Sequence, residues 1–152
     1  MRKHLIALEG KEYGDYAYEW YLDNIYRAGD EVVICHCSQF VLNVGLPGAA
    51  VNVDTVSRKV QEAVRRSEEI ATKAREKLKA KNIKGYVVIK SGMKPGDAIL
   101  KTVVEENVTH IIMGTRGLGP VQRTFLGSIS STVVSNAKVP VTIVKIPSEN
   151  SA

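Results

Sequence analysis

The chain has 152 residues, of which 44% are hydrophobic and 24% charged, and its formal net charge is +5. This length and composition indicate one globular domain with a sizeable core and exclude a disordered chain. No apolar run approaches the roughly 20 residues of a membrane-spanning helix, so we expect no membrane partner, and the mild positive charge suits anionic ligands without requiring nucleic acid.

Strand-like and helix-like patterns alternate along the whole chain. The longest expected helix has one apolar stripe that includes Val56, Val60 and Val64, and its other positions are mostly charged, so one side should cover a sheet. Asp97 is the expected N-cap of the helix that follows the third strand. Strands are expected at residues 3–8, 31–37, 86–90, 109–113 and 139–146, and helices at 13–28, 54–81, 97–106 and 128–137.

This alternation predicts an α/β fold. Right-handed crossovers between parallel strands give an open, Rossmann-like sheet with helices on both faces. The near-continuous apolar runs at 32–34 and 111–113 are typical of strands that are buried on both sides. In such sheets ligands bind at the carboxyl ends of the strands, where the winding direction reverses.

The ends of the chain and its two cysteines suggest a location. The apolar run after the first residues stops at Glu9, short of the about 7–15 residues of a secretory signal. Cys35 and Cys37 lie two apart in an expected strand, which does not imply a disulfide framework. The simplest expectation is one domain over residues 1–147 in the cytoplasm, with a polar tail at 148–152.

A glycine-rich segment follows the fourth expected strand. Gly114 and Gly117 allow a ligand close to the backbone, and Gly127 precedes a helix whose free N–H groups suit a phosphate. The hydroxyls of Ser128 and Ser130 can donate hydrogen bonds, and the guanidinium groups of Arg116 and Arg123 can neutralise phosphate charge. The alternative is an ordinary loop between a strand and a helix.

The spacing Gly114-x2-Gly117-x9-Gly127-Ser128 resembles the G-2x-G-9x-G-(S/T) motif of ATP-binding universal stress proteins. The turn at 96–99 and the strands at 109–114 and 139–141 also resemble that family. The resemblance implies a five-stranded sheet of order 3-2-1-4-5 that holds ATP across strands one and four. It also implies a homodimer through the apolar strand 139–146, which would lie at a sheet edge.

The resemblance also implies residues for the site. Ala7, Leu8 and Glu9 would contact the adenosine, and Cys37 would offer backbone to adenine. Met113 would lie close to the phosphates and ribose, which Gly114, Gly117, Gly127, Ser128 and Ile129 would line. The family usually has Asp where this chain has Glu9, whose longer side chain would have to contact the ribose hydroxyl with a different geometry. Lys11, the next cation along the chain, either approaches the phosphates or faces water.

Several motifs are absent. The chain has no Gly-x4-Gly-Lys-(Ser/Thr) loop and no obvious acidic pair to hold a catalytic metal. We therefore expect a regulatory protein of the stress response that holds ATP, with Mg or Mn on the phosphates and little or no hydrolysis. The alternatives are a slow ATPase or nucleotide-dependent enzyme, and a nucleotide-free interaction module.

Other side chains could suggest a metal, redox or nucleic-acid site, but structural roles explain them more simply. His4, His36 and His110 are expected to be structural, and the two cysteines to be packing residues. The basic run over 73–84 is expected on the solvent side of its helix, so nucleic acid is not an expected partner. The long loop at 38–53 is either a lid or partner-binding segment, or a loop packed on the surface.

Overall fold

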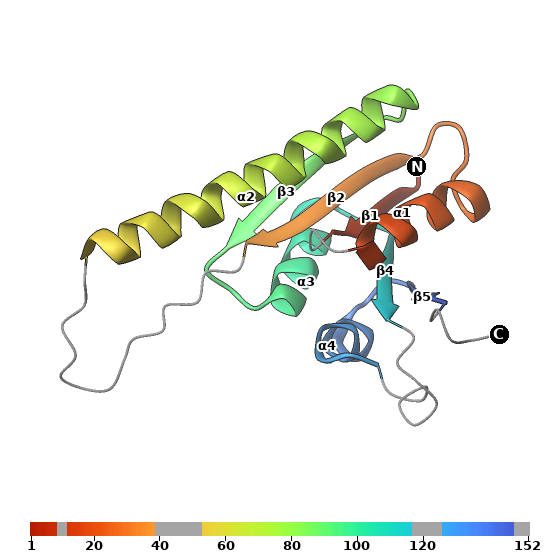
Figure 1. The fold of residues 1–152 in the computed structure, drawn as a ribbon. Coiled ribbons are helices and arrows are strands. Elements are labelled where there is room, and N and C mark those ends of the chain that lie inside the picture. The colour runs from red at the N-terminus through yellow and green to blue at the C-terminus, as the bar shows by residue number, and fades with distance from the viewer. Residues whose placement is uncertain (9–11, 39–52, 117–125, 148–152) are drawn as a thin grey trace.

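The computed structural model describes residues 1–8, 12–38, 53–116 and 126–147 (Figure 1). The strands are β1 (Lys3–Ala7), β2 (Glu31–Ser38), β3 (Gly85–Ser91), β4 (His110–Arg116) and β5 (Val141–Ile146). The helices are α1 (Glu12–Asn24), α2 (Val53–Ala80), α3 (Pro95–Glu105) and α4 (Ser128–Asn136). No helix in these described ranges is long and apolar enough to cross a membrane.

All five strands form one parallel sheet in the order β3-β2-β1-β4-β5, which confirms the expected α/β fold. The central strand β1 pairs with β2 through Leu5–Val33 and with β4 through Leu5–Ile111. The first three strands extend the sheet to one side, and β4 and β5 extend it to the other. The winding direction therefore reverses between β1 and β4, and their carboxyl ends emerge side by side.

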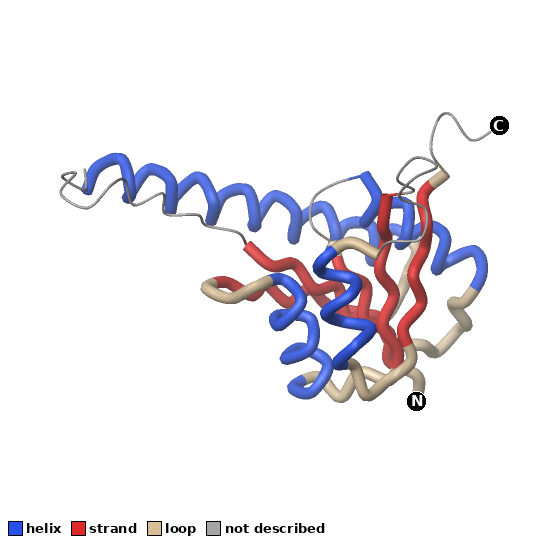
Figure 2. Tube along the Cα trace, turned by 90° about the horizontal axis from the view of Figure 1, so that it is seen from below, coloured by secondary structure: helices blue, strands red, loops and turns tan. Residues whose placement is uncertain are grey.

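Helices cover both faces of the sheet (Figure 2). Helices α1 and α2 pack with Ile6, Ile34 and Ile112 on one face, whereas α3 and α4 pack with Leu5, Val33 and Ile111 on the other. These strand residues are completely buried, as alternation in a two-sided sheet requires.

Two helix boundaries differ from the sequence-based expectation by more than one residue. The proposed N-cap Asp97 is wrong: α3 begins at Pro95 after the extended residue Lys94, because proline has a fixed φ that suits the first helical position and needs no N–H acceptor there. Helix α1 ends at Asn24 rather than at residue 28. Beyond the helix the backbone N–H groups of Ile25 and Tyr26 both donate to the carbonyl of Tyr21, at 2.9 and 3.0 Å, which satisfies a carbonyl of the last turn.

A partly buried polar cluster lies at the amino ends of the strands. His4 Nδ1 and His110 Nδ1 share a hydrogen bond at 3.0 Å, and His110 Nε2 lies 2.7 Å from the hydroxyl of Thr142. Asp30 faces His4 Nε2 at 3.4 Å and forms a salt bridge with Arg2. Burial lowers the pKa of both histidines, so both are neutral at pH 7. This cluster is structural, as expected, and joins β2, β1, β4 and β5 far from their carboxyl ends.

We predict that Gly85→Ala lowers the free energy of unfolding by about 1–3 kcal/mol, the usual cost of overpacking. A Cβ there would overlap the Val32 carbonyl oxygen and lie 3.2 Å from Leu78 Cδ1. Urea unfolding measures the loss. Gly127→Ala is the matched control, because a Cβ at Gly127 meets nothing within 4 Å; equal losses in both variants would contradict the steric explanation.

We also predict that the free energy of unfolding decreases as pH falls from 7.5 to 5. The pKa values of His4 and His110 are lowered from 6.5 in the folded chain, so the unfolded chain takes up protons first as pH drops through 6.5. Urea unfolding at several pH values measures the slope, and NMR titration of the two imidazoles measures their pKa values. Titration of either ring at or above 6.5 would contradict this account.

Candidate functional site

The carboxyl ends of β1 and β4 form the floor of the candidate site. Ala7 and Leu8 follow the paired residue Ile6 on β1, and Met113 follows its partner Ile112 on β4. Ala7, Leu8 and Met113 are all buried, whereas Gly114 is only half-buried. The predicted contacts from strands one and four therefore lie next to one another at the switch point.

Strand β4 extends three residues beyond its predicted end. Gly114 lies within it and pairs with Val144, and Arg116 pairs with Ile146. The first glycine of the motif, Gly114, is therefore part of the sheet rather than of a loop. Glu9, Gly117, Arg123 and the side chain of Arg116 lie outside the described residues, as do residues 39–52 of the predicted lid and the tail at 148–152.

Helix α4 begins at the same edge, after Gly127. This N-cap is extended, with φ −61° and ψ 165°, and no side chain caps the helix. The first intrahelical bond runs from the Ser131 N–H to the Gly127 carbonyl at 2.9 Å. The N–H groups of the three residues between them point out of the helix without intrahelical acceptors. Gly127 and Ser128 are exposed, so this positive end of the helix is open to an anion.

Close packing of α3 against α4 fixes the position of that helix end. Gly96 in the first turn of α3 is buried, and a Cβ there would lie 2.9 Å from Thr132 Cγ2 and 3.7 Å from the Ile129 carbonyl. Ile129 is half-buried and Ser130 is buried. The predicted residues Gly127, Ser128, Ile129 and Ser130 therefore form one rigid turn.

Cys37 lies near the end of β2, as predicted, and one more residue, Ser38, completes the strand. Its thiol is buried and lies 3.5 Å from the carbonyl of Met93. Cys35, on the same face, is held deeper against Thr102, and burial raises the pKa of its thiol to about 11. Neither cysteine is in a disulfide, and Cys35 stays protonated, which makes it a poor nucleophile.

His36 anchors the end of β1, a role that the sequence did not reveal. Its Nδ1 lies 2.8 Å from the Leu8 carbonyl oxygen, and its Nε2 lies 3.2 Å from the hydroxyl of Ser67 on α2. Because the carbonyl can only accept, Nδ1 must be the donor. The backbone N–H of Leu8 also donates to Cys35, at 2.9 Å. Strand β2 thus holds Leu8 directly where β1 leaves the sheet, and α2 supports it through His36.

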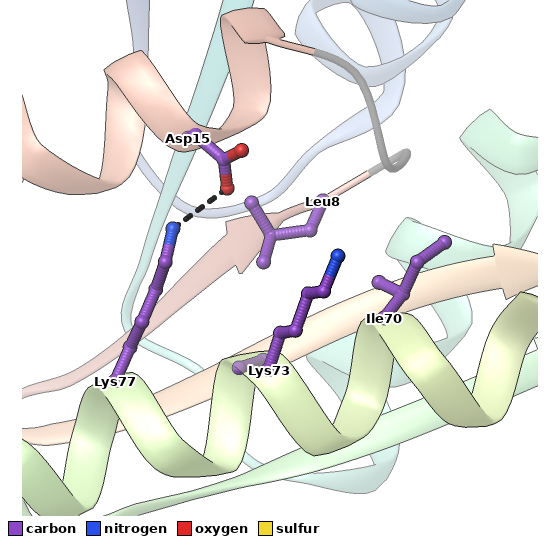
Figure 3. Close-up of a pocket in the computed structure, with 6 residues that line it drawn as sticks. Leu8, Asp15, Ile70, Lys73 and Lys77 are labelled. Carbon is purple, nitrogen blue, oxygen red and sulfur yellow. Dashed lines mark hydrogen bonds and ion pairs between the residues drawn. The ribbon is translucent and has the colours of Figure 1, made fainter.

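A small pocket opens beside Leu8 on the α1–α2 side, with a volume of about 170 Å³ (Figure 3). Leu8, Ile70 and Ala74 supply its apolar lining. Lys77 crosses one side to bind Asp15 at 2.8 Å, whereas the described residues place no carboxylate within ion-pair distance of Lys73. The pocket lies on the face opposite α4, so it is not the predicted phosphate position.

We predict that Ser67→Ala lowers the free energy of unfolding by about 1 kcal/mol, the usual net value of a buried hydrogen bond. Ser57→Ala is the matched control, since Ser57 is exposed on the same helix and shares the gain in helix propensity. The difference between the two variants in urea unfolding isolates the bond to His36. No difference would show that His36 is held without Ser67.

Comparison with known proteins supplies a family. The model of the universal stress protein family matches residues 1–145. A universal stress protein from Thermus aquaticus, named for its place in a QAH/OAS sulfhydrylase 3′ region, is 48% identical over 52 residues, which cover 34% of this chain and 38% of that protein.

Two solved structures share the fold. A universal stress protein family member from Arabidopsis thaliana with AMP bound has a TM-score of 0.72 and 19% identity, over 100% of this chain and 96% of its own. A universal stress protein in complex with cAMP has a TM-score of 0.56 and 17% identity, over 94% and 95%. At these identities the likeness shows the fold alone.

Proposed function

Because the chain belongs to the universal stress protein family, we propose that it is a regulatory protein of the stress response that binds an adenine nucleotide, principally ATP. The observation that carries this proposal is the open amino end of α4, which lies at the switch point beside the carboxyl ends of β1 and β4. A helix end with free N–H groups and no side-chain cap favours a phosphate. The AMP and cAMP bound to structural neighbours support the adenine part.

Each predicted residue has a part in this proposal. The end of β1 contacts the adenosine, the backbone at Cys37 meets the adenine, and Arg116 neutralises phosphate charge. The nucleotide contacts that we propose are Ala7, Leu8, Glu9, Cys37, Met113, Gly114, Arg116, Gly117, Gly127, Ser128, Ile129 and Ser130.

We propose that the chain holds ATP with little or no hydrolysis. Phosphoryl transfer needs a positioned metal and a group that orients the attacking water. Within the described residues, no group of three or more His, Cys, Asp or Glu side chains is arranged to hold a metal ion. Mg or Mn would then be carried by the phosphates themselves.

We further propose a cytoplasmic homodimer that forms through β5. Among the strands that the structure describes, this one pairs only with β4, so its outer edge offers backbone groups for pairing. Val141 and Ile143 are half-buried there, and only Val144 is fully covered. Pairing with a second copy would cover both the backbone edge and these side chains.

We predict that Gly127→Val weakens ATP binding at least about tenfold, the loss expected when one charge-assisted hydrogen bond is displaced, and leaves the fold intact. A branched side chain would project where phosphate approaches, whereas a Cβ there meets no protein atom. Calorimetric titration measures the affinity, and thermal unfolding checks the fold. Ser135→Val, at the exposed far end of the same helix, is the control; unchanged affinity in Gly127→Val would exclude this helix end.

Native mass spectrometry of the freshly purified chain, with extraction and chromatography of any nucleotide, tests the function as a whole. We expect a dimer that carries ATP. Turnover of added ATP to ADP, abolished in Gly127→Val, would instead favour a slow ATPase. A chain that is empty and refuses added adenine nucleotides would favour the interaction module.

A further inference from the structure

Helix α2 is much longer than the sheet that it covers. Its 28 residues span about 42 Å, whereas the eight residues of β2 span about 26 Å. Its amino-terminal half therefore projects past the carboxyl ends of β2 and β3 (Figure 1). Burial changes accordingly: Ala71, Ala74 and Leu78 are buried against the sheet, but residues 53–66 include no buried position.

The apolar stripe continues along this projecting half. Val53, Val56, Val60 and Val64 recur at three- and four-residue spacing in line with Ala71 and Leu78, and we call these four residues the valine stripe. Val53 is 74%, Val60 42% and Val64 57% exposed. Val56 is half-buried, so three of the four stripe residues are exposed. A stripe of this kind on a charged helix is typical of a docking surface.

A row of cations borders the stripe on one side. Lys59, Arg66 and Lys73 lie seven residues apart, and therefore on one side of the helix, and we call them the basic row. All three are exposed, and the described part of the chain places no carboxylate within ion-pair distance of their side chains. The last of them, Lys73, borders the pocket lined by Leu8, Ile70 and Ala74 (Figure 3).

A second copy of the chain fits this surface poorly. In the carboxyl-terminal half of α2 the sheet covers the same face of the helix. In a parallel arrangement the two sheets would collide, so two valine stripes can meet only when their helices run antiparallel. A twofold axis then brings the basic row of each copy against that of the other, and like charges in contact oppose association. Residues 39–52 of the chain itself contain no Asp or Glu, so they cannot complement the basic row.

We propose that the projecting half of α2 docks an amphipathic segment of another protein that has acidic residues along one edge. Its apolar face covers the valine stripe, its carboxylates face Lys59, Arg66 and Lys73, and one apolar side chain enters the pocket beside Leu8. An interface gains much of its binding free energy where an anchoring side chain fills a pocket, and this pocket lies at one end of the surface. This surface meets the proposed nucleotide site at Leu8, whereas the valine stripe and the basic row lie outside that site.

Two synthetic helical peptides of 18 residues test the proposal by fluorescence anisotropy with the full chain. Both have the same leucine stripe, and one has glutamates along one edge where the other has lysines. We expect the glutamate peptide alone to bind, and increasing salt to weaken it. The double variant Val60→Ser, Val64→Ser should weaken binding about tenfold or more from lost apolar burial, and Arg66→Glu, Lys73→Glu should weaken it while improving binding of the lysine peptide.

Matched controls separate the surface from the fold. Val104→Ser removes a valine that is 76% exposed on α3, and Lys79→Glu reverses an exposed charge elsewhere on α2; neither should change binding. Equal binding of the two peptides, binding of neither, or full binding by the stripe variant would overturn the proposal. So would a dimer in analytical ultracentrifugation that the stripe variant abolishes, or protection of Val60 and Val64 by residues 39–52 in the free chain.

Discussion

The central position of β1 is the constraint on which the rest of the structure depends. It lies in the middle of the sheet, with β2 and β3 on one side of it and β4 and β5 on the other. Parallel pairing aligns the strand ends, so the reversal of winding leaves the ends of β1 and β4 uncovered by a crossover helix. The amino end of α4 and the backbone at Gly114 lie at that edge of the sheet for topological reasons.

The two edges of this sheet use polar groups differently. At the amino edge, His4, His110 and Thr142 are closed in on one another, and burial keeps both imidazoles neutral. At the carboxyl edge, His36 uses both ring nitrogens to hold the Leu8 carbonyl and Ser67. The helix end at Gly127 remains without a side-chain cap. The hydrogen bonds of these histidines hold neighbouring strands together, whereas the helix end at Gly127 is exposed, so that a ligand can reach its free N–H groups.

The sequence predicted the order of elements, the sheet and the edge that carries the candidate site, because hydrophobic period and glycine spacing are local signals. It did not predict where α3 begins, since both Pro95 and Asp97 are good residues for a first turn; in the structure Pro95 starts the helix and Gly96 packs close to Thr132. The role of His36 was also out of reach. Its partners come from β1 and α2, which are 28 and 31 residues away in the chain.

Helix periodicity likewise says which face of α2 is apolar but not where the sheet beneath it ends. The residue types on that face differ between the half of α2 that covers the sheet and the half that projects beyond it. Ser67, Ala71 and Ala74 are small and buried, which lets the helix lie close to the strands. Val60 and Val64 in the projecting half are larger, exposed and β-branched, and valine costs a helix up to about 0.7 kcal/mol relative to alanine. Because Val60 is 42% and Val64 57% exposed, packing within the described fold offsets only part of that cost, and contact with another protein would offset more of it.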